Sequence, residues 1–463
     1  MLTCLTGKRV LVRVDHNVPL NKDGSISDDT RIVASLKTIK ELLGRNAKVT
    51  LMTHIGDPYK LKKGQMGKLT STKIVAERLQ ELLRKELGFE STEVVHTQQI
   101  VGDNVVKLRD QLNSNQILYL ENVRFNPAET GKGAEFDPAS GLYKQVKLSK
   151  DEVKAHAQEM AKLGDIFVMD GFGSAHRAHA SVSGVAEHVQ GPKVQGTLMQ
   201  EEVTQLAKLL DNPKRPFVAL IGGAKLEDKI EVTKSLTEQL TKGDSIIITG
   251  GMSHTFTLAK AEREGLINIT DESLSTEQKE EIAKSFIGSS IKELDKVAVA
   301  KEILERAEEK GIKLILPKDA VAVDMPVFDF EVMKNAKTRT VSSDKIPAGW
   351  QGLDVGPETL KEYAETLKGA HTILWNGPAG VFEEQKFAKG TEAIANMVAR
   401  ATKDNDAVSI LGGGDTITAL GKIENLSNTD FTHVSTGGGA SLEMIAERGN
   451  LPGVRAMDIK EAV

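Results

Sequence analysis

Short apolar runs alternate with longer amphipathic segments along almost the whole chain. The runs are rich in Val, Ile and Leu and do not alternate with polar residues, which is typical of strands buried on both faces of a parallel sheet. They are Arg9–Val14, Val49–Met52, Ile117–Leu120, Ile166–Met169, Phe217–Ile221, Ser245–Ile248, Lys313–Leu316, Thr372–Trp375, Ala407–Leu411 and His433–Ser435. Between them, segments such as Thr72–Leu87 repeat apolar residues at helical spacing. This alternation predicts an α/β fold of doubly wound parallel sheets.

The strands form two groups with a helical segment between them. Gly196–Asp211 has the pattern of a helix, and Pro213 and Pro216 follow it. We therefore expect two Rossmann-like domains, residues 1–190 and 213–444, joined by a hinge helix over residues 191–212. The polar segment Glu262–Gly288 predicts a surface insertion with a short helix, because Ser275-Thr-Glu-Gln278 matches a capping box.

The amino-acid composition reduces the number of protein classes to which the chain could belong. The 463 residues carry a net charge of −5 and 4% aromatic residues, which disfavours binding to nucleic acid or to an anionic membrane. No apolar run approaches the roughly 18 residues that span a bilayer. The single cysteine, Cys4, excludes a disulfide framework and favours a reducing compartment. Met1–Val14 shows no export or organelle signal, so we expect a cytoplasmic protein with no nucleic-acid or membrane partner.

In the first half, the strands run into charged and polar residues. Ligands of open α/β sheets bind beyond the carboxyl ends of the strands, and converging strands would gather there Arg13, Arg31, Arg124, Arg177, His54, His176 and His179. Guanidinium groups bind both phosphate and carboxylate, so this basin suits a small polyanion. The alternatives are isolated surface arginines or ion pairs. A metal site built from the histidines is disfavoured, since no carboxylate recurs with them at ligand spacing.

In the second half, the strands run into glycine. The segments are Gly222–Lys229, Gly250–Met252, Gly377–Gly380, Gly412–Thr416 and Gly437–Ser441. Glycine lets the backbone approach a phosphate, and a helix N-terminus behind it supplies free N–H groups. Lys225 and Lys229 would share one face of a helix, and Asp415 is a candidate oxygen ligand for Mg²⁺. The alternative is a set of tight turns.

Several common signatures are absent. The chain has no G-x-x-x-x-G-K-[ST] loop, no early G-x-G-x-x-G, no C-x-x-C or H-E-x-x-H, and no G-x-S-x-G. These absences disfavour Walker-type nucleotide sites, dinucleotide dehydrogenases, zinc enzymes and α/β-hydrolases. The residues alone therefore predict a two-domain enzyme that transfers a phosphoryl group between a small polyanion and a nucleotide.

The ordered segments together resemble phosphoglycerate kinase. Those that carry the resemblance are Arg13–Pro19, Thr53–Pro58, Glu121–Phe125, Asp170–His179, Gly222–Ile230, Gly352–Pro357, Trp375–Glu383, Gly412–Thr416 and Ser435–Ser441. The resemblance implies a glycolytic phosphotransferase with a carboxyl group as acceptor, which converts ATP and 3-phosphoglycerate reversibly into ADP and 1,3-bisphosphoglycerate with Mg²⁺. It also implies a monomer that bends about Gly196–Asp211, with residues 445–463 packed back on the first domain.

The resemblance assigns roles to individual residues. Substrate would be bound by the first domain, at the motif positions Asp15, His16, Asn17, Arg31, His54, Asp57, Arg124 and Arg177. ATP or ADP would be bound by the second domain, through Gly222, Gly223, Ala224, Lys225, Lys229, Gly250, Gly251, Gly352, Asn376, Pro378, Glu383, Gly413, Gly414, Asp415 and Thr416. Glu383 would take the ribose hydroxyls and Asp415 the metal. The transferred group would meet the catalytic set Arg31, Lys225, Gly414 and Gly437.

The chain departs from the family pattern at Asp57, where the substrate motif has arginine. A carboxylate there would repel a bound phosphate by about 1–3 kcal/mol, unless Asp57 turns to solvent or pairs with an arginine such as Arg31. Three readings follow: a working kinase with weakened substrate affinity, a catalytically impaired nucleotide-binding relative, or a kinase for a different small acid. His16, Met169 and Glu227 are milder departures.

Overall fold

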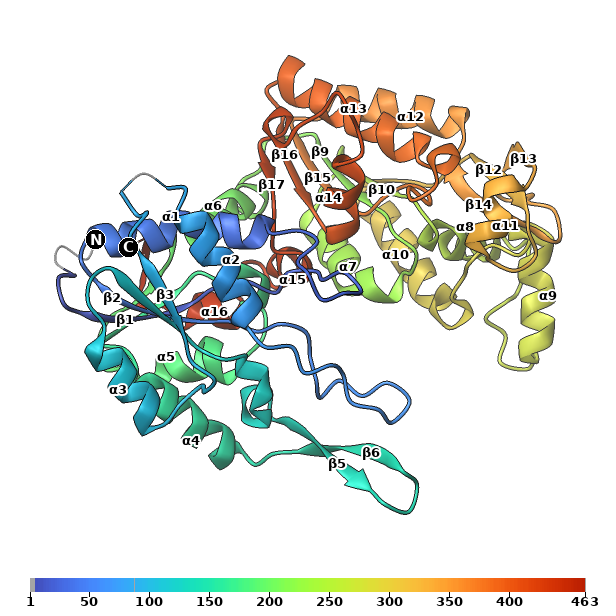
Figure 1. Ribbon diagram of the computed structural model, residues 1–463. Coiled ribbons are helices and arrows are strands. Elements are labelled where there is room, and N and C mark those ends of the chain that lie inside the picture. The colour runs from blue at the N-terminus through green and yellow to red at the C-terminus, as the bar shows by residue number, and fades with distance from the viewer. Residues whose placement is uncertain (1–4, 87, 463) are drawn as a thin grey trace. The chain divides into compact units, whose positions relative to one another are not determined.

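The computed structural model describes residues 5–86 and 88–462, so Cys4 lies outside the described residues. The chain divides into two compact units (Figure 1). Unit 1 runs to Thr204 and includes the segment from Gly449 onward, and unit 2 is Gln205–Arg448. Among the described residues, no helix has both the length and the apolar character needed to cross a membrane.

Unit 1 is built on a seven-stranded parallel sheet in the order β18-β8-β7-β1-β2-β4-β3. Its strands are β1 (Arg9–Arg13), β2 (Lys48–Met52), β3 (Glu93–His96), β4 (Gln116–Tyr119), β7 (Ile166–Met169), β8 (Lys193–Gln195) and β18 (Ile459–Ala462). The chain winds from the central β1 outward to β3 and then returns to β7 on the other side, so the predicted doubly wound topology is confirmed. The switch in direction beside β1 is where such sheets bind ligands.

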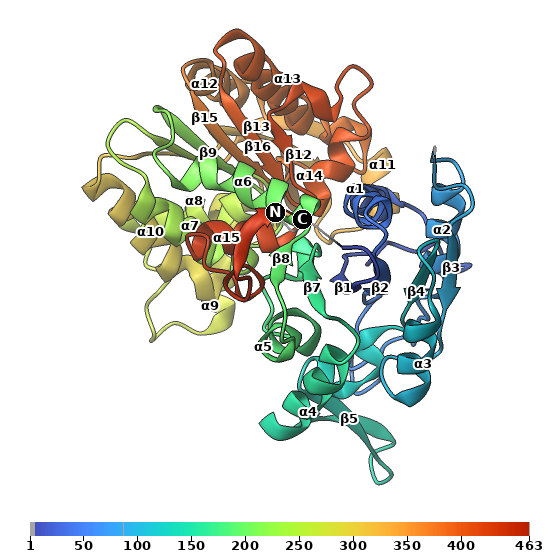
Figure 2. The same cartoon turned by 90° about the vertical axis from the view of Figure 1, so that its left-hand side faces the viewer.

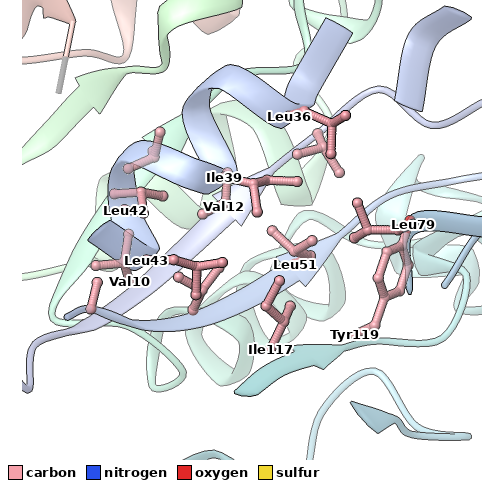
Figure 3. Close-up of a cluster of buried hydrophobic side chains, with 14 of the residues drawn as sticks. Val10, Val12, Leu36, Ile39, Leu42, Leu43, Leu51, Leu79, Ile117 and Tyr119 are labelled. Atoms are coloured by element: carbon pink, nitrogen blue, oxygen red, sulfur yellow. The ribbon is translucent and has the colours of Figure 1, made fainter. Parts of the chain in front are cut away.

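Helices cover both faces of this sheet (Figure 1). They are α1 (Thr30–Gly44), α2 (Lys73–Leu83), α3 (Asp103–Gln111), α4 (Lys150–Ala161) and α5 (Val185–His188), with α16 (Pro452–Arg455) from the C-terminal segment. On one face, Val10 and Val12 of β1 pack with Ile39 of α1 and Leu79 of α2 in a fully buried cluster (Figure 3). Burying such side chains stabilises the sheet by roughly 1.5–3 kcal/mol each, which holds the loops at its edge.

Unit 2 contains a six-stranded parallel sheet in the order β11-β10-β9-β15-β16-β17. Its strands are β9 (Phe217–Ile221), β10 (Ser245–Ile248), β11 (Lys313–Ile315), β15 (Thr372–Asn376), β16 (Val408–Gly412) and β17 (His433–Val434). Trp375 of β15 is fully buried with Tyr363 of helix α12 (Pro357–Lys368) and Val398 of helix α13 (Lys389–Asp404). The switch in winding lies between β9 and β15.

The helices of unit 2 flank this sheet, with α12 and α13 on one side and α7, α8 and α10 on the other (Figure 2). Their bounds are α7 (Ile230–Gln239), α8 (Met252–Arg263), α9 (Thr276–Ile287), α10 (Val297–Glu309), α11 (Phe330–Asn335), α12 (Pro357–Lys368), α13 (Lys389–Asp404), α14 (Gly414–Leu420) and α15 (Gly439–Ala446). Helix α9 begins at the predicted capping box, in which Ser275 and Gln278 cap each other's backbone N–H.

The connector differs in detail from the expectation. Helix α6 (Thr197–Leu210) occupies the predicted hinge, and the division between the units falls inside it. The preceding β8 pairs with β7, so part of the predicted connector belongs to the sheet of unit 1. Unit 2 also extends to Arg448, because Ser235 and Gln239 of α7 donate hydrogen bonds to carbonyls at the end of α15. The segment assigned to unit 1 therefore begins at Gly449 rather than at residue 445.

Two antiparallel structures were not predicted. Unit 2 carries a three-stranded sheet of β13 (Thr338–Ser342), β12 (Asp319–Asp324) and β14 (Trp350–Val355). Unit 1 carries a hairpin of β5 (Lys132–Asp137) and β6 (Leu142–Lys147). Single helical turns complete the structure: η1 (Val123–Phe125), η2 (Pro127–Glu129), η3 (Phe172–Ser174), η4 (Ala180–Gly184), η5 (Glu227–Lys229), η6 (Leu294–Lys296), η7 (Gln385–Phe387) and η8 (Asn428–Asp430).

Candidate functional site

Four loops of unit 1 begin at one edge of its sheet. In the register of the sheet, Arg13 at the end of β1 lies opposite Met52 of β2 and Met169 of β7. Leu51 of β2 lies opposite Tyr119 of β4. The segments after these strands therefore start side by side, as the sequence predicts.

Asp15 and Arg31 form the first pair at this edge. Asp15 is nearly buried, and its Oδ2 accepts a hydrogen bond of 2.7 Å from Arg31 Nη1. Asn17 follows, and its Oδ1 accepts from the amide of Gly56 at 2.9 Å. Gly173 lies against this pair, where a Cβ atom would collide with the Asp15 carboxylate. Sequence reasoning did not single out Gly173, although Gly171-Phe-Gly173 directly follows a strand.

Arg124 and the residues that contact it form a second cluster at this edge of the sheet. Asn122 positions it by accepting from the Arg124 amide at 3.1 Å, and Arg124 Nη1 donates to the Gly56 carbonyl at 2.8 Å. The Asp57 carboxylate lies 3.6 Å from the same Nη1. Of the alternatives considered for Asp57, the structure shows the pairing with an arginine, but the partner is Arg124 rather than Arg31.

The histidines of this edge are neutral at neutral pH. Burial and nearby arginines hold the pKa of His54 well below its usual value. The same causes lower the pKa of His179 to about 3 and that of His176 to about 4. The positive charge therefore rests on Arg31, Arg124 and the exposed Arg177, which is close enough to Arg124 to influence its pKa. Within the described ranges, no three His, Cys, Asp or Glu side chains are arranged to hold a metal ion.

Two residues of this region point away from a ligand. Arg13 is only 1% exposed, and its Nε donates to Ser181 Oγ at 2.8 Å. The side chain of His16 is not accessible to a substrate in this structure, so a contact at this predicted position would have to come from its backbone. Its ring is fully buried, with Nδ1 2.7 Å from Tyr119 Oη and Nε2 2.7 Å from Ser35 Oγ. Both ring nitrogens are therefore used inside the core.

In unit 2, the glycine loops pack on one another at the switch point. Gly377 has φ +98°, and a Cβ atom there would collide with the carbonyl of Gly222. Gly250 has φ +68°, and its Cβ would lie 2.7 Å from the amide of Gly223. Part of the glycine signal thus reflects close contact between loops rather than contact with a ligand.

A cleft of about 600 Å³ opens beside these loops. The predicted nucleotide residues that line it are Gly223, Ala224, Gly250, Gly251, Gly352, Pro378, Glu383 and Asp415. Its remaining wall is largely apolar and includes Ile291, Pro326, Phe328, Phe330 and Phe382. Sequence reasoning missed this wall, although Pro326-Val-Phe-Asp-Phe330 is a conspicuous apolar run outside the predicted strands. A planar base and a polar, phosphate-bearing end fit the two halves of the cleft.

Lys225 and Lys229 do not share a helix, contrary to the prediction. Helix α7 begins only at Ile230, and before it the Glu293 carboxylate accepts from the amides of Leu226 and Glu227 at the start of the single turn η5. Lys225 is exposed, whereas Lys229 donates to Asn376 Oδ1. Burial lowers the pKa of Lys229, and the nearby Asp415 opposes that shift.

The loops after β16 and β17 differ in which of their groups are already hydrogen-bonded within the protein. Gly413 has φ +96°, and α14 begins at Gly414, where a Cβ would meet no atom within 4 Å. The Thr416 hydroxyl is buried and accepts from the amide of Gly377 at 2.7 Å, so this side chain positions a loop. The Gly437 amide donates to Ser435 Oγ at 3.2 Å. Asp415 is exposed beside them.

Comparison with known proteins decides the family. The family model described as phosphoglycerate kinase matches residues 3–448. The chain belongs to the phosphoglycerate kinase family. The phosphoglycerate kinase of Chloroflexus aurantiacus is 43% identical over 456 residues, covering 98% of this chain and 97% of that protein. The phosphoglycerate kinase of Synechococcus elongatus is 41% identical over 454 residues, covering 98% of this chain and 96% of that protein.

Solved structures agree. Phosphoglycerate kinase from Coxiella burnetii matches with a TM-score of 0.72 at 32% identity, and that from Pyrococcus horikoshii with 0.71 at 29% identity. Each comparison covers 98% of this chain and 97% of the other. The two-unit α/β fold and the phosphoglycerate kinase function are those of this family, and nothing in the comparisons supports the impaired alternative.

Proposed function

We propose that this kinase transfers a phosphoryl group reversibly between ATP and the carboxylate of 3-phosphoglycerate, giving ADP and 1,3-bisphosphoglycerate. The observation that carries the proposal is the gathering of Arg31, Arg124 and Arg177 at the switch point of unit 1. A substrate with a phosphate at one end and a carboxylate at the other matches several separate guanidinium groups.

On the substrate side, the roles are those that the family resemblance implies, and the geometry is compatible with them. Asp15 and Asn17 hold Arg31 and the Gly56 loop in place, and the Asp15 carboxylate and the Asn17 amide NH2 group would suit a substrate hydroxyl. Arg124 and Arg177 would bind the phosphate. Arg31 would neutralise charge on the group in transfer. Neutral His54 would act as a hydrogen-bond donor rather than as a cation.

On the nucleotide side, the apolar half of the cleft would hold the base and Glu383 the ribose hydroxyls. The glycine loops, with Lys229 beside them, would hold the phosphates. Lys225 and the amide of Gly414 would contact the transferred group, with Gly437 in the neighbouring loop after β17.

Mg²⁺ fits the donor set, with Asp415 as its protein ligand. Mg²⁺ is usually held by one or two carboxylates together with substrate phosphates and waters. An exposed carboxylate at the mouth of the cleft meets that requirement. When bound, the ion would neutralise phosphate charge during transfer.

The chemistry needs positioning more than proton transfer. A carboxylate nucleophile carries no proton, so no general base is required. The protein must align the reacting oxygens and exclude water that would otherwise hydrolyse ATP. The setting implied by the family is a monomeric, cytoplasmic enzyme of glycolysis that bends about α6.

A coupled assay tests the proposal. The natural chain should consume Mg-ATP only when 3-phosphoglycerate is present, and Arg31→Met should lower kcat by about a hundredfold or more, because it removes a charge that acts on the transferring group. Arg45→Met is the matched control, since Arg45 pairs with Glu41 on α1 away from the basin. If turnover does not depend on 3-phosphoglycerate but another small acid supports it, that acid replaces 3-phosphoglycerate as the proposed substrate.

A further inference from the structure

A line of buried polar groups lies behind His54. Glu129 Oε1 accepts a hydrogen bond of 2.6 Å from Ser181 Oγ, and Glu129 Oε2 accepts one of 2.8 Å from the Ser181 amide. Ser181 Oγ accepts from Arg13 Nε at 2.8 Å. Arg13 Nη2 lies 3.0 Å from His54 Nδ1. Arg13, Glu129 and Ser181 are each at most 1% exposed, so water does not compete for these bonds.

The direction of the last bond follows from chemistry. A guanidinium group only donates hydrogen bonds, so His54 Nδ1 must accept. A neutral imidazole that accepts at Nδ1 carries its proton on Nε2. Arg13 has little freedom to release the ring, because Nη1 also donates to the Val14 carbonyl and Nε is held by Ser181.

The surroundings of His54 explain why the position of the proton on its ring matters. The groups close enough to influence it include Arg124, Arg31 and His179, so the ring lies within the cationic basin. With the proton on Nδ1, the ring would present an unprotonated nitrogen from Nε2, which repels an anion. With the proton on Nε2, it presents a donor that binds one.

We propose that Arg13 is a positioning residue that holds His54 in its Nε2-protonated form, so that the neutral ring donates a hydrogen bond to the anionic substrate. Ser181 and Glu129 fix the orientation of Arg13. The substrate part of this inference rests on the proposed function, whereas the position of the proton on His54 does not.

The proton position is measured on the full chain without substrate. Ring nitrogen chemical shifts in an ¹⁵N-histidine-labelled sample distinguish the two neutral forms. The expected result for the natural chain is protonation at Nε2. Finding Nδ1 protonated overturns the proposal even if Arg13→Met fails to fold. In folded Arg13→Met, we expect a mixture of the two forms, and an unchanged Nε2-protonated ring also overturns it.

Kinetics separate the role of Arg13 in setting the His54 tautomer from the proposed use of 3-phosphoglycerate as substrate. Arg13→Met should raise the KM for 3-phosphoglycerate about tenfold, the value of one hydrogen bond to a charged group, and leave the KM for ATP unchanged. Ser174→Ala is the control, since Ser174 Oγ is a buried neighbour that bonds only the Gly171 carbonyl. If the natural chain has Nε2 protonated but does not use 3-phosphoglycerate, the proposed function fails and the role of Arg13 in setting the tautomer stands. Equal increases in both KM values would mean a general structural role and would overturn the positioning role.

Discussion

At the scale of single residues, Asp57 is the departure from the family pattern that bears most directly on the proposed substrate site. Its carboxylate is about one-third exposed and lies 3.6 Å from Arg124 Nη1, so it would compete with the proposed substrate anion for that guanidinium. A partly exposed pair of this kind is worth up to about 1 kcal/mol. We expect Asp57→Asn to lower the KM for 3-phosphoglycerate up to about fivefold, as measured in the coupled assay.

The KM for ATP should stay the same in this variant, because Asp57 belongs to unit 1. Asp23→Asn is a suitable control, since Asp23 is exposed and bonds only with Ser25. A KM for 3-phosphoglycerate that rises in Asp57→Asn would mean that the carboxylate contributes to binding instead of competing with it.

The buried His16 leads to a different kind of prediction. Tyr119→Phe removes the hydroxyl that lies 2.7 Å from His16 Nδ1 and leaves a buried ring nitrogen without that partner. We expect the free energy of unfolding to fall by about 1–3 kcal/mol, with no change in the KM for 3-phosphoglycerate. Urea denaturation and the assay measure the two effects. A large change in KM with no loss of stability would restore His16 to the substrate site.

At the scale of elements, Asp170 joins β7 to the connecting helix. Its Oδ1 accepts from the amides of Leu198 and Met199 in the first turn of α6, at 3.0 and 3.2 Å. Gly196 allows this approach, because a Cβ atom there would collide with the carboxylate. Burial raises the pKa of Asp170 from 3.8 to about 6.

The raised pKa predicts a pH dependence of stability. Between about pH 4 and 6, the folded chain retains a proton that the unfolded chain releases, so this group's contribution to stability falls as the pH rises. Relative to Asp170→Asn, the natural chain should lose up to about 3 kcal/mol across that window. Urea midpoints of both chains at several pH values measure the difference. A natural chain that gains stability relative to Asp170→Asn as the pH rises would contradict a pKa raised by burial.

The elements also show what the sequence could and could not predict. Most of the predicted strands of the two parallel sheets carry their signal in a short run dominated by apolar residues, as in Phe217–Ile221. The β5–β6 hairpin is polar, and β12–β14 depend on antiparallel pairing, so neither has such a local signal. The position of His16 depends on Tyr119, 103 residues away, and no spacing rule reveals that contact. The arginine basin was predictable because each arginine follows its own strand or turn.

At the scale of the whole molecule, the chain crosses between the two units at only two places. These are Thr204–Gln205, inside α6, and Arg448–Gly449. The proposed substrate residues all belong to unit 1 and the proposed nucleotide residues all belong to unit 2. Phosphoryl transfer requires the reacting oxygens to come almost into contact, so the proposed reaction requires the two units to bring their ligands together.

We therefore expect the radius of gyration to fall when both ligands are bound. Small-angle X-ray scattering on the full chain would compare no ligand, 3-phosphoglycerate alone, a non-hydrolysable Mg-nucleotide alone, and both together. Each ligand alone contacts one unit and has little to gain from closure, whereas the pair gains charge neutralisation that neither unit supplies by itself. Equal radii with and without the pair would show that the units do not bend about α6. A decrease in the doubly bound natural chain that is lost in Arg31→Met would link the movement to the residue that meets the group in transfer.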